Sequence, residues 1–209
     1  MGTTRSMETF LEELGSSAPA PGGGAASAVA GALAAALAEM VAQLTVNKPR
    51  FAEVQTTMRS AIERTRAARD DLLRLVSEDE AAFQRVSAAY RLPRTSDGER
   101  SKRSAAIQEA LAEAMQPPLQ IMRRACEVVE LAAQIAMSGN PTVASDAGCA
   151  ALIGEAAVRA AGLNVLANVV LLNDAAKASA AREEMARCEQ RAARAREETL
   201  RTVAERMRA

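Results

Sequence analysis

Apolar residues recur along most of the chain at the three- and four-residue spacing that is typical of an α-helix, and breaker residues separate these segments. Residues 7–14 form a first short helical segment, which ends at Gly15. Residues 16–24 then combine Ser, Ala, Pro and Gly and predict a loop. Residues 25–46 are apolar on most sides, so we expect a buried helix that stops at Asn47-Lys48-Pro49.

The rest of the chain is divided by Leu92-Pro93, by a polar loop at residues 95–98, by Pro117-Pro118 and by a break at residues 138–141. Between these breaks we expect helices over residues 50–91, 104–115, 118–137, 142–173 and 183–208. The last of them is rich in Arg and Glu and carries only a thin apolar stripe. No strand-like alternation and no internal repeat interrupts this pattern. The sequence therefore predicts an all-α, single-domain antiparallel helical bundle over residues 1–209.

Alanine dominates the apolar share of the sequence. Hydrophobic residues make up 49% of the chain, whereas aromatic residues make up 2%. Small side chains let helices approach closely, but each buries little area, at roughly 25 cal/mol per Å² of apolar surface. We therefore expect many tight helix contacts and a partner subunit.

Charge and cysteine content exclude several classes of partner and compartment. Lys+Arg and Asp+Glu both number 26, so no net positive field attracts nucleic acid, and few aromatic rings are available to stack on bases. The three cysteines are an odd number without metal-ligand spacing, which favours a reducing cytoplasm. Glutamates in the first segment argue against a signal peptide, and residues 22–38 look too weakly hydrophobic for a membrane span. We expect a soluble protein that does not bind a membrane.

The chain contains no histidine. This removes the commonest general base near neutral pH, every Ser-His or Cys-His nucleophile, and most zinc sites. Any chemistry must use carboxylates, lysines, hydroxyls or amides, and no metal site is expected.

Asp79 is the most informative of the carboxylates. At about 100° per residue it falls inside the stripe that Leu72, Val76 and Phe83 form, so it should point inward. A carboxylate on an apolar face is costly unless it is paired, and such groups often have functional pKa values. A buried structural ion pair with an arginine is the alternative. The neighbouring Glu78 and Glu80 fall outside the stripe and are expected to be solvated.

A second polar cluster, Asn140, Ser145 and Asp146, stands at the start of the helix predicted from residue 142. Such residues can form a binding site at a helix N-terminus, and simple helix capping explains them equally well. Asn164 and Asn168 share one face further along this helix and are secondary candidates. They lie about 27 Å from Asp146 at 1.5 Å per residue, so one site would need a helix break or a second subunit.

Three further features could bind anions. The backbone N–H groups of Gly22, Gly23 and Gly24 precede a long helix, although three glycines also let backbones pack closely. Lys48 follows the C-terminus of that helix, and Arg103 flanks the polar loop at residues 95–98. Most such charges are only solvated.

Several stretches, taken in order, resemble the cyclodeaminase/cyclohydrolase family, which includes the C-terminal domain of formiminotransferase-cyclodeaminase and bacterial methenyltetrahydrofolate cyclohydrolases. The resemblance spans nearly the whole chain. It is carried by Phe10-Leu11, Pro21-Gly22-Gly23-Gly24, Gly31-Ala32-Leu33, Met40-Val41, Leu44-Thr45, Asp79 with Ala82-Phe83, Leu92-Pro93, Arg103-Ser104-Ala105-Ala106-Ile107-Gln108, Gly139-Asn140-Pro141, Ser145-Asp146-Ala147-Gly148 and Asn164-Val165. The chain departs from the pattern at Ala25-Ala26, where a hydroxyl residue is frequent, and at Asn47, where a glycine often precedes the lysine.

The resemblance implies a helical homodimer that binds reduced folate, with or without a polyglutamate tail, and needs no cofactor beyond tetrahydrofolate as substrate carrier. The enzyme would make or open the N5,N10-methenyl bridge, as a 5-formiminotetrahydrofolate cyclodeaminase or a 5,10-methenyltetrahydrofolate cyclohydrolase. The chain has no transferase half, which favours the cyclohydrolase. A non-enzymatic oligomeric scaffold, in which inward polar residues only set register, is the alternative from another class.

In this reading, Asp79 and Asp146 carry out proton transfer or electrostatic stabilisation. Asn140 and Ser145 would orient the substrate, and the Gly22 to Gly24 turn would contact it. Lys48 or Arg103 would meet the anionic glutamate.

Overall fold

The computed structural model describes residues 5–208, which fold into seven α-helices and two short 3₁₀-helices. In chain order these are α1 (Met7–Leu14), α2 (Gly23–Gln43), η1 (Pro49–Val54), α3 (Gln55–Tyr90), α4 (Asp97–Ala114), α5 (Gln116–Ser138), η2 (Pro141–Val143), α6 (Ala144–Val169) and α7 (Ala175–Arg206). No strand occurs among the described residues, and the all-α prediction is confirmed. The single-domain organisation stays a prediction.

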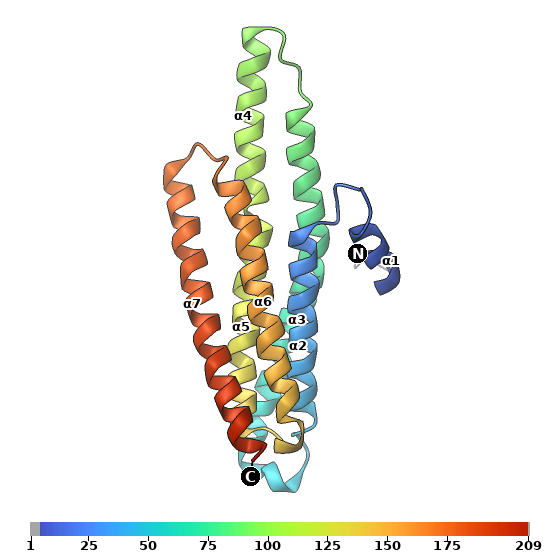
Figure 1. The fold of residues 1–209 in the computed structure, drawn as a ribbon, viewed down its shortest axis with the longest axis vertical. Coiled ribbons are helices and arrows are strands. Elements are labelled where there is room, and N and C mark those ends of the chain that lie inside the picture. The colour runs from blue at the N-terminus through green and yellow to red at the C-terminus, as the bar shows by residue number, and fades with distance from the viewer. Residues whose placement is uncertain (1–4, 209) are drawn as a thin grey trace.

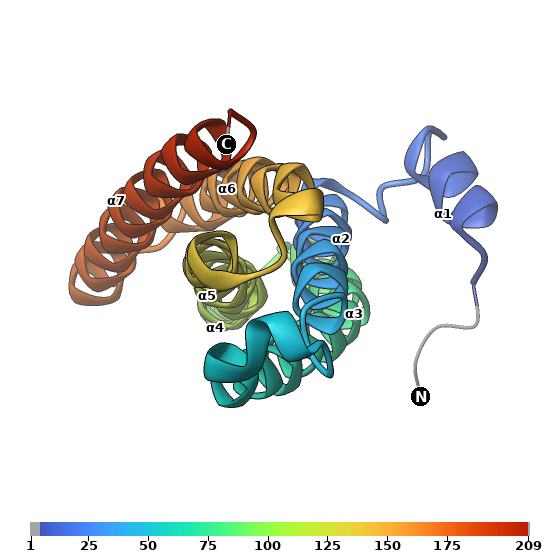
Figure 2. The same ribbon diagram turned by 90° about the horizontal axis from the view of Figure 1, so that it is seen from below.

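The helices α2, α3, α5, α6 and α7 lie side by side along the long axis of the molecule (Figures 1 and 2). α4 continues into α5 along the same axis, and together with the last turns of α3 it extends beyond the bundle (Figure 1). α2 runs down the bundle while α6 runs up beside it, so Gly23 at the start of α2 meets Asn164 near the end of α6. α1 stands to the side of α2 and α3 (Figure 2).

Small residues allow the central helices to pack closely. Alanines supply many of the fully buried positions, including Ala25, Ala34 and Ala150. A Cβ built on Gly154 of α6 would lie 2.7 Å from a methyl group of Val129 on α5. The expectation of tight, Ala-rich helix contacts therefore holds in the core.

Two helix starts differ from the sequence prediction because side chains cap them. α4 begins at Asp97 rather than near Ser104, since Ser96 and Glu99 form a capping box. α7 begins at Ala175 rather than near Glu183, since the Asp174 side chain accepts a hydrogen bond from the N–H of Lys177.

The interior of the bundle includes a buried carboxylate. Glu39 on α2 is 8% exposed and forms ion pairs with Arg66 at 2.9 Å and Arg69 at 2.8 Å, both on α3. Two partners compensate the cost of burying this charge. The three cysteines are free thiols, of which Cys126 and Cys188 are buried.

Two segments, α2 and Pro141–Val169, are long and apolar enough to cross a bilayer by length and composition. The expectation that residues 22–38 are too weakly hydrophobic for a span is therefore wrong. In the fold, 61% of the most apolar window of α2 and 44% of that of Pro141–Val169 are buried. Both helices contribute many buried residues to the core, and they also expose large apolar side chains such as Leu33 on α2 and Leu163 on α6.

Candidate active site

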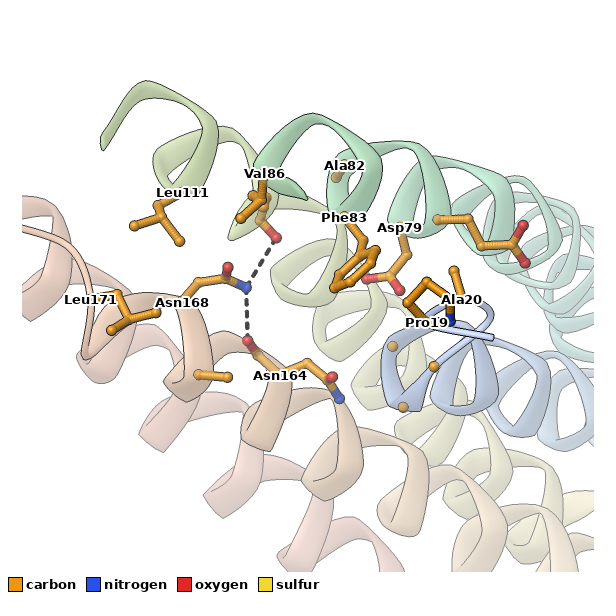
Figure 3. A pocket seen from close by; sticks show the side chains of 16 residues that line it. Pro19, Ala20, Asp79, Ala82, Phe83, Val86, Leu111, Asn164, Asn168 and Leu171 are labelled. Atoms are coloured by element: carbon orange, nitrogen blue, oxygen red, sulfur yellow. Dashed lines mark hydrogen bonds between the residues drawn. The ribbon is translucent and has the colours of Figure 1, made fainter. Parts of the chain in front are cut away.

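A cavity of about 360 Å³ opens where α2 begins, between α2, α3, α4 and α6 (Figure 3). The loop before α2 contributes Pro19 and Ala20 to its wall. The lining residues are Pro19, Ala20, Gly22, Gly23, Gly24, Asp79, Glu80, Ala82, Phe83, Val86, Leu111, Ala114, Asn164, Ala167, Asn168 and Leu171. Asp79 and the three glycines of the predicted turn therefore lie in one site.

The glycine turn places the N-terminus of α2 against the Asp79 carboxylate. Gly22 is the N-cap residue and provides no side-chain hydrogen bond to the first turn. A Cβ on Gly24 would collide with all three atoms of the Asp79 carboxylate, so the absence of a side chain at this position makes the contact possible. The anion at this helix N-terminus is thus a carboxylate of the protein itself.

Burial raises the pKa of the Asp79 carboxyl above its ordinary value. A hydrogen bond from the N–H of Ala25 lowers this pKa, and the nearby charge of Glu80 raises it, but burial is the largest of the three influences. Asp79 forms no ion pair with any arginine among residues 5–208, which does not support the structural alternative. The raised pKa and the position beside the cavity make Asp79 a candidate for proton transfer.

Glu80 also lines the cavity, and the expectation that it is solvated is wrong. Its carboxylate pairs with Arg5 at 2.6 Å, and the Glu80 side chain is only 21% exposed. Arg5 also pairs with Glu13 and lies over the Phe10 ring, 5.0 Å from its centroid. The Arg5 guanidinium therefore connects α1, through Glu13 and Phe10, to Glu80 in the wall of the cavity.

Two amides of α6 face the cavity from the side opposite α3 (Figure 3). The Asn168 Nδ2 donates to the carbonyl oxygens of Ala114 and Asn164, and the Asn164 Nδ2 donates to the Ala160 carbonyl. With both NH₂ groups held by the backbone, the side-chain oxygens can accept hydrogen bonds from a bound molecule. These secondary candidates belong to the same cavity as Asp79.

The remaining wall of the cavity is apolar. Phe83 and Val86 of α3 face Leu111 of α4 and Leu171, which follows α6 (Figure 3). Phe83 is 42% exposed, because it borders the cavity rather than the core. The cavity therefore combines an apolar wall with hydrogen-bonding groups at Asn164, Asn168 and Asp79, as small-molecule sites commonly do.

The cluster of Asn140, Ser145 and Asp146 lies at the other end of α6, away from this cavity. The Asn140 side chain accepts from Thr142 and donates to the Leu44 carbonyl at 3.3 Å, so it joins η2 to the end of α2. Asp146 lies in the first turn of α6 but no side chain caps this helix. Within one chain the structure does not bring these residues to Asp79, and α6 has no break at Gly162.

The two basic candidates also lie outside the cavity lining. Lys48 is exposed as the N-cap of η1, at the same end of the bundle as Asp146. Arg103 on α4 donates to the Tyr90 carbonyl at 3.1 Å and lies over the Tyr90 ring. Tyr90 follows the cavity residue Phe83 by seven residues on α3, which corresponds to about 11 Å along the helix at a rise of 1.5 Å per residue. Arg103 is therefore held about this far beyond the cavity.

No group of three or more His, Cys, Asp or Glu side chains that could hold a metal ion occurs in the described part of the chain. The sequence pattern did not place Glu80 at the cavity and made Asn164 and Asn168 secondary candidates, whereas all three line the cavity beside Asp79. The lengths of the predicted helices could have indicated the position of the two amides. If α2 and α6 are antiparallel neighbours of similar length, the end of α6 lies beside the start of α2.

A family model described as formiminotransferase-cyclodeaminase matches residues 6–187 of the chain. The chain is 40% identical to a methenyltetrahydrofolate cyclohydrolase from Methylorubrum extorquens over 185 residues, which cover 88% of this chain and 89% of the relative. It is 34% identical to the formimidoyltransferase-cyclodeaminase of Rattus norvegicus over 81% of this chain, but spans only 31% of that longer protein.

The fold is also similar to a solved structure. The crystal structure of formiminotetrahydrofolate cyclodeaminase from Thermotoga maritima superimposes with a TM-score of 0.86 and 30% sequence identity, covering 96% of both chains.

Proposed function

The chain belongs to the formiminotransferase-cyclodeaminase family, and from this premise we propose that it is a folate enzyme that opens the methenyl bridge of 5,10-methenyltetrahydrofolate. The observation that carries the proposal is Asp79, a carboxyl group with a raised pKa in the wall of a largely apolar cavity. The identity of 40% to a cyclohydrolase of nearly equal length favours the cyclohydrolase reaction over cyclodeamination.

In cyclohydrolysis, water attacks the methenyl carbon, and one C–N bond to that carbon then opens. The attacking water must lose a proton, and the departing nitrogen must gain one. A protonated Asp79 supplies the second of these protons. The oxygens of Asn164 and Asn168 would accept hydrogen bonds from the pterin and fix its orientation relative to Asp79.

Cyclodeamination of 5-formiminotetrahydrofolate is the second candidate, and the fold shared with the Thermotoga maritima cyclodeaminase favours it. Here N10 attacks the formimino carbon and ammonia leaves, so the same acid would protonate the leaving nitrogen. Neither reaction requires histidine, a metal or a redox cofactor, and we propose tetrahydrofolate as the only carrier.

The finer properties of the enzyme also follow from the family as proposals. The protein would be a soluble, cytoplasmic homodimer that takes reduced folate with or without further glutamates. Arg103 would meet the glutamate carboxylates, because the apolar wall from Phe83 to Val86 leads from Asp79 toward Tyr90, where Arg103 is held.

Absorbance assays with 5,10-methenyltetrahydrofolate and with 5-formiminotetrahydrofolate test the proposal directly. Turnover of the methenyl compound is expected, and turnover of the formimino compound alone would transfer the assignment to the cyclodeaminase. If neither compound is converted and calorimetry detects no folate binding, the protein is the non-enzymatic scaffold instead.

A further inference from the structure

Two neighbouring residues of α3 place their carboxyl groups in the wall of the same cavity. Asp79 and Glu80 are the only titratable side chains that line it among the described residues. Two adjacent carboxyl groups do not ionise independently, because the charge on one disfavours the charge on the other. The chemistry of the site therefore depends on which of the two keeps a proton.

Arg5 distinguishes the two carboxyl groups. Its guanidinium donates to the Glu80 carboxylate at 2.6 Å, and the exposed fractions of the two side chains are 17% and 21%. This hydrogen bond is the largest influence on the pKa of Arg5, which it raises. A bond between two charged groups, both partly withdrawn from water, stabilises the ionised form of Glu80. Asp79 receives no such cation, since the influences on its pKa are burial, the N–H of Ala25 and Glu80 itself.

The other helices around Asp79 bring no charged side chain to the lining of the cavity in the described part of the chain. α2 contributes its glycines and the N–H of Ala25, α4 contributes apolar side chains such as Leu111, and α6 contributes the amides of Asn164 and Asn168. Burial is the largest cause that raises the pKa of Asp79, and the charge of Glu80 adds to it. The charge that acts on Asp79 thus comes from its own neighbour.

Contacts with α1, which stands beside α2 and α3, hold Arg5 in position (Figure 2). The guanidinium also pairs with Glu13 and lies over the ring of Phe10, whose side chain is anchored in the core at 6% exposure. A cation over an aromatic ring is stabilised further where water is partly excluded. The loop from α1 to α2 contributes Pro19 and Ala20 to the cavity wall, so the segment that encloses the cavity also carries the cation.

We propose that Glu80 is a positioning residue: held as a carboxylate by Arg5, it keeps the proton of the pair on Asp79 and so makes Asp79 the acid of the site. The inference rests on the proposed folate reaction for the use of that proton, whereas the arrangement of charges is independent of the substrate. Two carboxyl groups in unlike environments divide into an acid and an ionised partner. Without Arg5, Glu80 would compete for the proton, and the two groups would titrate as a pair.

Removing the charge of Glu80 should weaken the hold of Asp79 on its proton. In Glu80→Gln, the falling limb of the kcat–pH profile should move to lower pH by about 1 unit, because a nearby like charge shifts a carboxyl group by an amount of this order. At pH values above the limb, kcat should then be about tenfold lower than in the wild type. A limb that does not move would overturn the proposal.

Removing Arg5 should act in the opposite direction. In Arg5→Gln the charge of Glu80 is no longer compensated, so the pair binds a proton more tightly and the limb should move to higher pH. Just below the limb kcat should fall, because part of the proton now resides on Glu80. Arg5→Lys keeps the positive charge and should restore the wild-type limb. A shift to lower pH in Arg5→Gln would contradict the assigned role.

A double variant separates this role from a merely structural one. Arg5 also contacts Glu13 and Phe10, so Arg5→Gln loosens α1 as well as freeing Glu80. If Arg5 acts through Glu80, Arg5→Gln should move the limb much less in a chain that already carries Glu80→Gln. Equal shifts in both backgrounds would overturn the proposal, because Arg5 would then act by another route.

Glu78→Gln is the matched control. Glu78 is the other acidic neighbour of Asp79 on α3, but it is bonded to Arg74 and does not line the cavity. Its side chain is 40% exposed, so water and salt screen its charge. The limb should therefore stay at its wild-type position. An equal shift in Glu78→Gln and Glu80→Gln would indicate a general effect of charge on α3 and would overturn the specific role of Glu80.

NMR of protein labelled isotopically at the aspartate carboxyl carbons observes Asp79 without any substrate. The chain has few aspartates, and the spectrum of Asp79→Asn identifies the signal of Asp79. This signal should titrate at lower pH in Glu80→Gln than in the wild type, and at higher pH in Arg5→Gln. Circular dichroism verifies the helix content of each variant, and Glu80→Gln alone decides the question if Arg5→Gln does not fold.

The NMR titration and the folate assays fail independently. If neither folate is converted while the Asp79 signal moves as expected, the proposed function is refuted and the arrangement of charges stands. If a folate is converted while the Asp79 signal titrates alike in Glu80→Gln and in the wild type, the function stands and the role of Glu80 is overturned.

Discussion

At Asp79, two physical effects act on one carboxyl group in opposite directions. The N-terminus of α2 favours the ionised form, whereas burial in the cavity wall favours the protonated form. Burial has the larger effect, and the pKa of Asp79 is raised. The residue is therefore held at a cost to stability, as is usual for catalytic groups.

Replacing Asp79 by Asn should abolish most activity and preserve or increase the free energy of unfolding at pH 7. Between the ordinary pKa of aspartate and the raised pKa, the unfolded chain has released its proton while the native chain keeps it. Folding then takes up a proton, so the contribution of Asp79 to stability falls as pH rises through this window and stays unfavourable above it. Urea unfolding at several pH values measures this effect.

The rate is expected to fall by about 10²- to 10⁴-fold in the same variant, as for the loss of a general acid. In the wild-type enzyme, kcat should decrease as pH rises through the raised pKa, because the acid form is then lost. A variant with lower stability and an unchanged rate would make Asp79 a structural residue.

Gly24→Ala should inactivate the enzyme, because the new methyl group takes the space of the Asp79 carboxylate. Gly22→Ala is the matched control, since nothing lies within 4 Å of a Cβ at that position. Steady-state kinetics of both variants, with circular dichroism to verify helix content, measures the difference. Equal activity of the two would mean that Asp79 moves freely and that its position is not needed.

Sequence reasoning could identify Asp79 because a carboxylate stands out in an apolar helical stripe. It could identify the glycine turn because three glycines at a helix start are unusual. It could not identify Glu80, whose place in the wall depends on Arg5, far away in the sequence. The sequence gives the distance between Asn164 and Asp146 along one helix, but it does not show that Asn164 lies near Asp79. That proximity follows from the antiparallel arrangement of α2 and α6, which brings Asn164 to Gly23.

At the scale of elements, periodicity predicted which segments are helices better than where they begin. Gly15 marks the end of α1 correctly, because a glycine acts locally. Pro49 marks a break but not the helix ends around it, since α2 already ends at Gln43 and α3 begins only at Gln55, after the 3₁₀-helix η1. The starts of α4 and α7 were placed too late, because polar first turns at Ser96 and Asp174 look like loops until their caps are seen.

One close approach between α5 and α6 depends on the absence of a side chain at Gly154. Gly154→Ala should lower the free energy of unfolding by about 1–3 kcal/mol, because a Cβ there meets Val129 at 2.7 Å in a packed interior. Gly98→Ala, where nothing lies within 4 Å, is the control and should be neutral or slightly stabilising. Urea denaturation of both variants measures the effect, and equal stabilities would mean that α5 and α6 can separate at no cost.

At the scale of the whole molecule, an apolar outer face on two core helices is the feature that a single chain does not explain. Leu163→Arg should yield a folded monomer with little activity, because the charge would be buried between subunits. Leu73→Arg is the matched control: Leu73 is 48% exposed on α3, which contributes nothing to the outer faces of α2 and α6, so this variant should stay dimeric and active. Light scattering with size-exclusion chromatography reads out the mass of each, and a dimeric Leu163→Arg would place the interface elsewhere.

The close fit of Asp79 against Gly24 also bears on how the bundle selects one alignment of its helices. A slip of one residue along α2 corresponds to about 1.5 Å and 100°, and it would bring Gly23 or Ala25 opposite the carboxylate. In a bundle whose core is mostly alanine, neighbouring alignments bury similar amounts of surface and differ little in energy. Because Gly23 also lacks a side chain, the contact discriminates only against the slip that brings Ala25 and its methyl group opposite the carboxylate. The residue proposed to act on the substrate would then also help to specify the fold, and redesigns that remove it should be examined for mispaired helices.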